Sequence, residues 1–337
     1  MHVIDMHCDT IARLYHTSAA LRENPYHLDL IKLQKSQYLL QNFALFVNQK
    51  ECIDPLETAL NMADFYYLEL EKNKDLIAPV FSYKDIEKNQ KTGKISAMLT
   101  LEEGAVLRGQ LSHLRNFYRL GVRMIALTWN YNNEIGAPNL QFSLEGQPLL
   151  SARSMVGLTE QGIQIIQEME RLGMIIDVSH LSDGGFWDVV KHTTKPFVAS
   201  HSNAASLCNV CRNLTDDMIR ALGTQGGVMG LNFCTDFLRE PTEGTRSSMG
   251  GILSSNYIPV SKISDMVRHV QYIANVGGIE VCALGSDFDG IQNHLEFGDA
   301  SGIGQLADAL KKAGFTASEV DKIFYQNVLR VYKEVLV

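Results

Sequence analysis

The sequence predicts a (β/α)8 barrel of the TIM type, and three observations support that fold class. Short runs rich in Val, Ile, Leu and Met recur along the chain, and amphipathic stretches separate them. Eight such runs are long enough for strands, and apolar strands that alternate with helices form a parallel sheet buried on both faces. The 337 residues show no break in composition, and eight such units favour closure into a barrel over an open doubly wound sheet.

The strands are expected at residues 3–7, 42–47, 96–101, 123–128, 174–178, 196–200, 227–232 and 281–286. Between them, residues 111–120 and 158–172 place apolar side chains three and four positions apart, the spacing of an amphipathic helix. No G-x-G-x-x-G or Walker-type loop follows a strand, which disfavours a nucleotide-binding fold. Two polar segments, 130–154 and 235–259, interrupt the pattern. We expect one catalytic domain over 1–337, with these segments as insertions at the active face.

Composition excludes several classes of partner. The net charge of −8 argues against nucleic acid, because nucleic-acid-binding proteins usually present a basic face. No apolar run reaches the roughly 18 residues of a membrane span. The amino-terminal MHVIDMHCDT lacks the basic and apolar regions of a secretory signal, so we expect a cytoplasmic protein. Cys208 and Cys211 form a C-x-x-C pair without a matching second pair, and we interpret them as partly buried thiols.

The residues that end the predicted strands are polar and able to bind metals. They are His7 and Asp9 after the first strand, Glu102 and Glu103 after the third, His180 after the fifth, His201 after the sixth and Asp287 after the eighth. The carboxyl ends of barrel strands share one face, where barrel enzymes build their active sites. His7 and Asp9 stand two apart on an extended segment, so their side chains point the same way. The pattern predicts a metal site on that face.

Three histidines and two carboxylates are a nitrogen and oxygen donor set that suits zinc. Five ligands exceed the needs of one tetrahedral catalytic ion, and they fit two metals that share a bridging carboxylate. We therefore expect two zinc ions per chain. The other histidines fall in expected helices, in loops or near the termini, and we interpret them as structural or solvent-facing.

Motifs spread over nearly the whole chain resemble those of the zinc-dependent membrane dipeptidase (renal dipeptidase) family, including its soluble bacterial members. They are, in order, VIDMHCDT, AMLTLEEG, RLGVRMIALTWN, GMIIDVSHLSD, PFVASHSNAASLCNVCRNLTDD, VMGLNF and VCALGSDFDG. Several widely spaced motifs in the right order make this match specific. The resemblance implies a zinc dipeptidase for short peptides with a free carboxyl terminus, and it leaves open whether D-residues are accepted at the second position.

The resemblance assigns the metal ligands residue by residue. The H-x-D pair corresponds to His7 and Asp9, and the histidines of D-V-S-H and S-H-S correspond to His180 and His201. The bridging glutamate, taken as the one directly before glycine, corresponds to Glu103. His7, Asp9 and Glu103 are therefore expected around one zinc ion. The other ion is expected among Glu103, His180 and His201.

The same resemblance assigns the residues that act on substrate. Asp287, the first aspartate of D-F-D-G, is expected to take a proton from a metal-activated water and pass it to the leaving amine. We expect Glu103 to be the second catalytic residue. Arg212 is expected to bind the substrate carboxylate through its planar guanidinium. Trp129 stands where better-known members have a substrate-contacting histidine. We expect Trp129 and Asn232 to line the pocket.

Two other functions stay open at this stage. One is another binuclear-metal hydrolase of the same architecture, acting on a cyclic amide, a lactone or a phosphoester. Many such enzymes have H-x-H on the first strand, whereas this chain has H-x-D. The other is a metal-binding homologue with little or no turnover, for which Trp129 is the only support. The expected partner is a small dipeptide, and analogy with related proteins suggests a homodimer.

Overall fold

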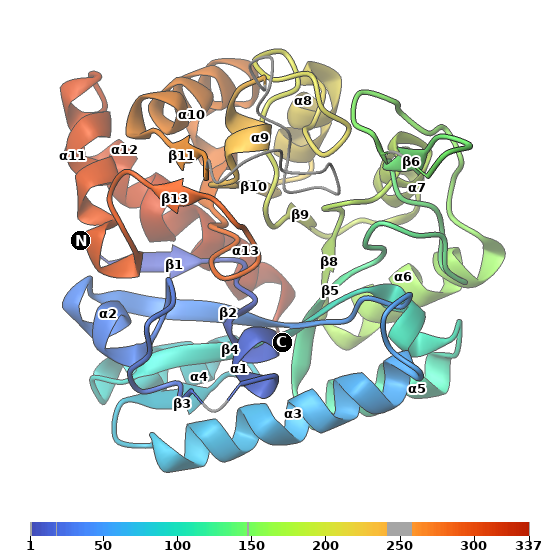
Figure 1. Cartoon of the computed structure of the whole chain (residues 1–337), viewed down its shortest axis with the longest axis horizontal. Coiled ribbons are helices and arrows are strands. Elements are labelled where there is room, and N and C mark those ends of the chain that lie inside the picture. The colour runs from blue at the N-terminus through green and yellow to red at the C-terminus, as the bar shows by residue number, and fades with distance from the viewer. Residues whose placement is uncertain (1, 18, 147, 241–257, 337) are drawn as a thin grey trace.

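Eight parallel strands close into a barrel in the computed structural model of the chain, which describes residues 2–17, 19–146, 148–240 and 258–336 (Figure 1). In pairing order they are β1 (Val3–Asp5), β2 (Tyr38–Phe46), β4 (Ile95–Glu102), β5 (Val122–Ala126), β8 (Ile175–Asp177), β9 (Val198–Ala199), β10 (Val228–Leu231) and β12 (Cys282–Leu284). The pairing of Asp5 with Leu284 joins β12 back to β1 and closes the ring. Each expected strand overlaps one of these, so the predicted (β/α)8 barrel is confirmed.

Helices surround the barrel and connect its strands (Figure 1). The α-helices of the described residues are α1 (Thr10–Tyr15), α2 (Leu30–Lys35), α3 (Pro55–Lys72), α4 (Tyr83–Lys91), α5 (Leu111–Leu120), α6 (Glu160–Leu172), α7 (Asp183–His192), α8 (Asp216–Thr224), α9 (Thr235–Leu238), α10 (Ile263–Gly277), α11 (Gly304–Lys312), α12 (Ala317–Asp321) and α13 (Asn327–Val335). Shorter helical turns are η1 (Gly104–Leu107), η2 (Ile279–Val281), η3 (Ala300–Gly302) and η4 (Lys322–Gln326). The two helices expected from apolar spacing are present as α5 and α6.

Local chemistry explains where these helices begin and end. The side chain of Asp54 accepts hydrogen bonds from the N–H groups of Leu56 and Glu57, and these bonds cap the start of α3. α5 and α6 end at Gly121 and Gly173, whose φ angles are 109° and 74°. Glycine adopts this left-handed conformation without a side-chain clash, so it stops a helix at low cost.

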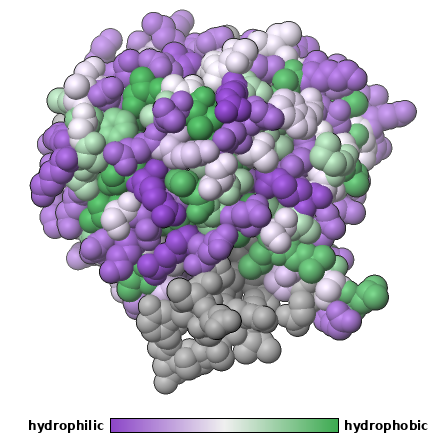
Figure 2. Space-filling model, turned by 90° about the horizontal axis from the view of Figure 1, so that it is seen from above, coloured by the Kyte–Doolittle hydropathy of each residue, from purple (hydrophilic) through white to green (hydrophobic). Residues whose placement is uncertain are grey.

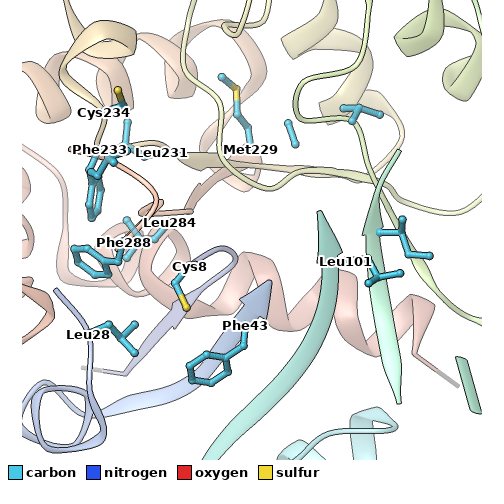
Figure 3. Close-up of a cluster of buried hydrophobic side chains, with 14 of the residues drawn as sticks. Cys8, Leu28, Phe43, Leu101, Met229, Leu231, Phe233, Cys234, Leu284 and Phe288 are labelled. Carbon is cyan, nitrogen blue, oxygen red and sulfur yellow. The ribbon is translucent and has the colours of Figure 1, made fainter. Parts of the chain in front are cut away.

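The core has one layer inside the barrel and one between the barrel and its helices. The inner layer gathers buried side chains from the strands and from α13, among them Ile4, Leu40, Met98, Met124, Ile175 and Tyr332. The hydroxyl of Tyr332 accepts a hydrogen bond from Nδ2 of Asn42 at 2.7 Å, so α13 is fixed inside one end of the barrel. In Figure 3, Cys8, Phe43 and Phe288 of the outer layer lie beside β1 and β2. Polar side chains, among them Glu102 and His201, lie at the carboxyl ends of the strands.

Several short strands were not expected from the sequence. β3 (Ile77–Pro79) pairs with the start of β4, where β4 extends beyond its contact with β5. β6 (Gln141–Phe142) and β7 (Pro148–Leu149) form an antiparallel hairpin, and β11 (Val260–Ser261) pairs with β13 (His294–Leu295). The β6–β7 hairpin lies within the segment expected as the first insertion. Of the second expected insertion, at 235–259, residues 241–257 lie outside the described part of the chain.

The outer surface is mostly hydrophilic on the face that Figure 2 shows, with hydrophobic side chains scattered among the hydrophilic ones. Within the ranges that the structure describes, none of the helices combines the length and apolar character needed to cross a membrane. This agrees with the lack of a long apolar run in the sequence.

Candidate active site

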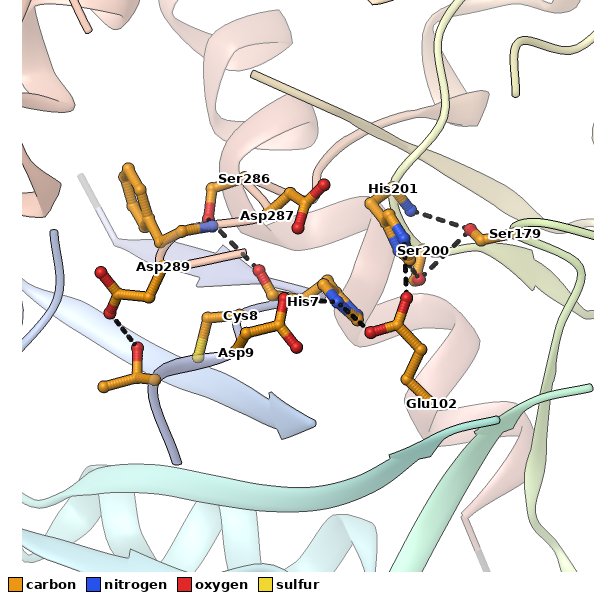
Figure 4. Close-up of polar contacts among 12 residues, drawn as sticks. His7, Cys8, Asp9, Glu102, Ser179, Ser200, His201, Ser286, Asp287 and Asp289 are labelled. Carbon is orange, nitrogen blue, oxygen red and sulfur yellow. Dashed lines mark hydrogen bonds and ion pairs between the residues drawn. The ribbon is translucent and has the colours of Figure 1, made fainter. Parts of the chain in front are cut away.

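Three histidines converge on one buried carboxylate at the carboxyl ends of the barrel strands. Figure 4 shows two of them, His7 and His201, beside Glu102. Glu102 ends β4, and its Oε1 lies 3.0 Å from Nε2 of His180 and 3.4 Å from Nε2 of His201. Its Oε2 lies 3.2 Å from Nε2 of His7, and Oδ2 of Asp9 lies 3.5 Å from the same nitrogen. All five side chains are buried. The structure thus brings together four of the five predicted ligands, around the glutamate that was expected to be only a neighbour.

The expectation that Glu103 joins this cluster is wrong by one residue. Side chains alternate along a strand, and β4 directs Met98 into the barrel, so Glu102 also points inward. Glu103 follows the strand with a φ of 112°, and its carboxylate accepts from N–H of Ala105 at 2.9 Å and from Nδ2 of Asn133 at 2.6 Å. Burial is the main reason that its pKa is raised to about 7. The alternation along β4 identifies Glu102 once the inward direction of Met98 is known from the structure.

The cluster has the properties of a cation site. Ligand atoms of His7, Glu102 and His201 all lie within 4.8 Å of one another, and so do those of His7, Asp9 and Asp287. Oδ1 of Asp9 is buried and makes no hydrogen bond within the described residues, and Nε2 of His7 is surrounded by carboxylate oxygens of Glu102 and Asp9. Buried polar atoms without partners are costly, and they require an explanation such as a bound ion. The residues present therefore fit a metal centre.

Two of the three histidines have lowered pKa values, as neutral metal ligands require, whereas the pKa of His7 is raised because the charges of Glu102 and Asp9 outweigh its burial. Burial, together with the positive charge of Arg212, lowers the pKa of His180 to about 3. Burial also holds the pKa of His201 well below its usual range, so both rings are neutral and offer a lone pair. Burial raises the pKa of Asp9, and the nearby charge of Glu102 raises it further. A cation beside Asp9 would favour its ionised form, because an opposite charge at short range lowers the pKa of a carboxyl.

The ring of His180 is oriented by a residue that sequence reasoning missed. Oδ1 of Asn130 lies 3.0 Å from Nδ1 of His180. An amide oxygen only accepts hydrogen bonds, so Nδ1 bears the proton and Nε2 faces Glu102 with its lone pair. Asn130 directly follows Trp129, but no spacing or motif marks it as a partner of a residue 50 positions away.

Asp287 lies at the edge of the cluster and is partly exposed. Its Oδ2 accepts a hydrogen bond from Nδ2 of Asn232 at 2.9 Å, and burial raises its pKa although the charge of His7 opposes that effect. Asn232, which was expected to line the pocket, also reaches the carbonyl of His201 at 3.4 Å. The amide of Asn232 thus holds Asp287 against β9.

Unusual backbone angles concentrate around this site. Six described residues other than glycine have positive φ, and four of them adjoin the cluster, namely Glu103, His180, Asp287 and Asp289. Such conformations cost on the order of 1–3 kcal/mol each and persist where the surrounding contacts determine them, often at functional sites. The loops after β4, β8 and β12 therefore hold their side chains in place at some cost in stability.

Gly290 borders the cluster so closely that we expect a methyl group there to disturb it. A Cβ at this position would lie 2.1 Å from Oδ2 of Asp9 and 2.4 Å from Oδ1 of Asp287. Gly290→Ala should displace both carboxylates, reduce the metal content of the purified protein, and lower the free energy of unfolding by about 1–3 kcal/mol. The control is Gly304→Ala, because nothing lies within 4 Å of a Cβ at that position. Equal metal contents in the two variants, measured by mass spectrometry, would contradict the expectation.

Arg212 is buried beside the cluster and keeps part of its hydrogen-bonding capacity. Nη2 donates to the carbonyl of His201 at 3.2 Å, and Nη1 donates to Oγ of Ser202 at 3.4 Å. Its Nε is buried and makes no hydrogen bond to another described residue. The guanidinium carbon lies 5.3 Å from the ring centre of Phe237. Arg212 therefore places a positive charge next to His201 and keeps one N–H without a partner among the described residues.

The 130–154 segment holds the chain on both sides of Arg212. Nδ2 of Asn139 donates to the carbonyl of Cys211 at 3.0 Å. Nη2 of Arg153 donates to the carbonyl of Asn213 at 2.9 Å, and its Nε donates to Asp183 at 2.7 Å. This part of the expected insertion is thus packed against the site. Cys211 and its C-x-x-C partner Cys208 are free and buried, as expected.

Trp129 lies half-buried beside the cluster. Its ring centre is 6.3 Å from that of His180 and 4.9 Å from that of Phe46, which it meets edge-on. Tyr131 is the next aromatic neighbour, with a ring centre 5.8 Å away. The indole therefore forms part of an aromatic group next to a candidate metal ligand.

Comparisons with known proteins agree with one another. A model of the membrane dipeptidase family (peptidase family M19) matches residues 1–336. An uncharacterized dipeptidase of Schizosaccharomyces pombe is 31% identical over 91% of this chain and 72% of its own length. An uncharacterized protein of the pqqA 5′ region of Klebsiella pneumoniae is 40% identical over 75% of this chain and 87% of its own. The solved structure of dipeptidase AC, a metallopeptidase of family M19, has a TM-score of 0.85 and 25% identity, with 100% of this chain and 99% of the other covered.

Proposed function

Because this chain belongs to the membrane dipeptidase family (peptidase family M19) and is a metallo-dipeptidase, we propose that it uses two zinc ions to hydrolyse dipeptides with a free carboxyl terminus. His7 and Asp9 would hold one ion, His180 and His201 the other, and Glu102 both. When bound, the ions would activate a water molecule and polarise the peptide carbonyl.

The position of Glu102 is the observation on which the two-metal proposal rests. One carboxylate oxygen faces His7, and the other faces His180 and His201. A carboxylate with each oxygen directed at a separate ligand group is suited to bridge two cations. The nitrogen and oxygen donors of both groups favour zinc over calcium or magnesium, which prefer oxygen donors alone.

The chain's own residues would perform the remaining tasks. Asp287 lies beside His7 and Asp9, and it would accept the proton of the attacking water and return it to the leaving amine. Asn232 holds one oxygen of Asp287, which leaves the other oxygen for this exchange. Arg212 would bind the substrate carboxylate and so fix the scissile bond relative to Asp287. Trp129 would contact the substrate near His180.

We expect Arg212→Ala to lower kcat/KM for L-Ala-L-Ala by roughly 10- to 100-fold, because hydrogen bonds to a charged group are lost. The zinc content should be unchanged, since Arg212 is not among the proposed ligands. The control is L-Ala-L-alaninamide, which lacks the carboxylate, so the variant and the unsubstituted protein should differ far less on it. An equal loss on both substrates would remove Arg212 from carboxylate binding.

A metal and substrate screen tests the whole proposal. We expect two zinc equivalents per chain, loss of activity on chelation, and recovery when zinc is restored. The zinc-loaded protein should hydrolyse L-Ala-L-Ala or L-Ala-D-Ala, and the ratio of the two rates measures the preference at the second position. Hydrolysis of a hydantoin or a phosphotriester without any dipeptide hydrolysis would overturn the proposed substrate class. A cytoplasmic location and a homodimer stay predictions, testable by cell fractionation and by sedimentation.

A further inference from the structure

Two buried aspartates next to the site are bound in the same way. Oδ1 of Asp5 accepts from the N–H of His7 at 3.3 Å and from the N–H of Ser286 at 2.8 Å. Oδ1 of Asp177 accepts from the N–H of Ser179 at 2.9 Å and from the N–H of Ser200 at 2.8 Å. In both cases Oδ2 accepts the hydroxyl of the same serine. The Asp5–Ser286 pair joins β1 to β12, and the Asp177–Ser200 pair joins β8 to β9.

The two pairs differ in what the serine contacts next. Oγ of Ser200 lies 2.7 Å from Nδ1 of His201, a proposed zinc ligand (Figure 4). Oγ of Ser286 instead has backbone neighbours, since it lies 3.2 Å from the carbonyl of His7 and accepts from the N–H of Phe288 at 3.1 Å. The same arrangement is therefore connected to an imidazole in one place and to the main chain in the other.

The hydrogen bonds of Ser200 determine which ring nitrogen of His201 bears the proton. A hydroxyl has a single proton, and a carboxylate oxygen only accepts hydrogen bonds, so Ser200 donates its proton to Oδ2 of Asp177. Oγ of Ser200 then presents a lone pair to Nδ1 of His201, and Nδ1 must be the donor. The ring is held as the Nδ1–H tautomer, and unprotonated Nε2 faces Glu102.

We propose that Asp177 and Ser200 are positioning residues that hold His201 in its metal-binding tautomer and so set the zinc affinity of the Glu102, His180 and His201 half of the site. This inference rests on the proposed two-metal function. Ser179 supports the arrangement, because its Oγ accepts from the N–H of His201 at 3.1 Å and lies 3.3 Å from Oγ of Ser200. Partners that orient a metal-binding histidine commonly change metal affinity by about 10- to 100-fold.

Asp177→Asn tests the proposal, because it keeps the shape of the side chain and reverses one hydrogen bond. The amide oxygen would stay with the two N–H groups, so the amide nitrogen would donate to Oγ of Ser200. The Ser200 proton would then turn to Nδ1 of His201 and move the ring proton to Nε2, where it blocks zinc. We expect one of the two zinc affinities to fall by about 10- to 100-fold. Long-range 1H–15N NMR of histidine-labelled protein should show that the Nδ1–H of His201 is lost.

Asp5→Asn is the matched control, because it reverses the same bond in the pair without a ring. The hydroxyl of Ser286 can then turn to the carbonyl of His7, which already lies 3.2 Å away. We expect both zinc affinities to stay within about threefold and the His201 signal to be unchanged. Equal losses of affinity in Asp5→Asn and Asp177→Asn, or an unchanged His201 signal in Asp177→Asn, would overturn the proposal.

The unsubstituted protein separates this inference from the proposed function. If it binds fewer than two zinc ions or cleaves no dipeptide, the proposed function fails. If it does both and the two asparagine variants behave alike, the positioning role alone fails. If circular dichroism shows that Asp177→Asn does not fold, Ser200→Ala can be used instead, because it removes the acceptor of the His201 proton. Ser286→Ala is then the matched control. Both serines are fully buried, so the two alanine variants leave similar cavities.

Discussion

Replacing Glu102 by Gln should remove most of the bound metal and lower kcat/KM on dipeptides by at least about 10³-fold, because the activation of water depends on the metal ions. Its carboxylate is the one group that faces His7 with one oxygen and His180 with the other. A neutral amide would present a nitrogen donor to one of these rings, and that nitrogen cannot bind a cation. Zinc content and dipeptide kinetics, measured on the same preparation, check this expectation.

Glu103→Gln is the matched control, since it makes the same change one residue further along the chain. The side chain of Glu103 binds Ala105, Asn133 and Gln49 outside the metal cluster. We expect this variant to keep both zinc ions and to lose mainly thermal stability. Loss of metal in Glu103→Gln together with its retention in Glu102→Gln would instead make Glu103 the metal-binding glutamate.

The fold was predictable because its signal is repeated along the chain. Each apolar run and each amphipathic helix is a short-range pattern in the sequence, and eight repeats of strand and helix together predict a (β/α)8 barrel. β3 was missed because it is short, contains Pro79 and pairs outside the ring of eight strands. Strand ends were displaced by a few residues, for example at β2, which begins at Tyr38 rather than at residue 42.

The site was predictable to the extent that strand ends determine it. His7, Asp9, His180 and His201 lie together because parallel strands deliver their last residues to one face. The choice between Glu102 and Glu103 depends on which face of β4 points into the barrel, and the apolar residues on both faces of this strand do not determine that face from the sequence. The hydrogen bond between Asn130 and His180 joins residues that are 50 positions apart and meet only because the barrel packs their loops together. No spacing in the sequence encodes it.

Asp287→Asn should lower kcat by about 10²- to 10⁴-fold while the protein keeps its zinc, because the variant loses a proton acceptor and little else. Its amide oxygen can still accept from Nδ2 of Asn232, so the side chain keeps its position. KM for dipeptides should change little, since Arg212 would still bind the carboxylate. Loss of one zinc ion in this variant would instead make Asp287 a ligand together with its neighbours His7 and Asp9.

Asp289→Asn distinguishes this role from simple support of the loop. Asp289 lies two residues further along, is buried, and has a φ of 69° against 62° for Asp287. Its oxygens accept from the hydroxyl of Thr10 at 2.6 Å and from the N–H of His27 at 2.8 Å, which are structural contacts between loops. We expect Asp289→Asn to lower the melting temperature and to retain most of kcat. Equal losses of kcat in the two variants would mean that Asp287, like Asp289, only supports the loop after β12.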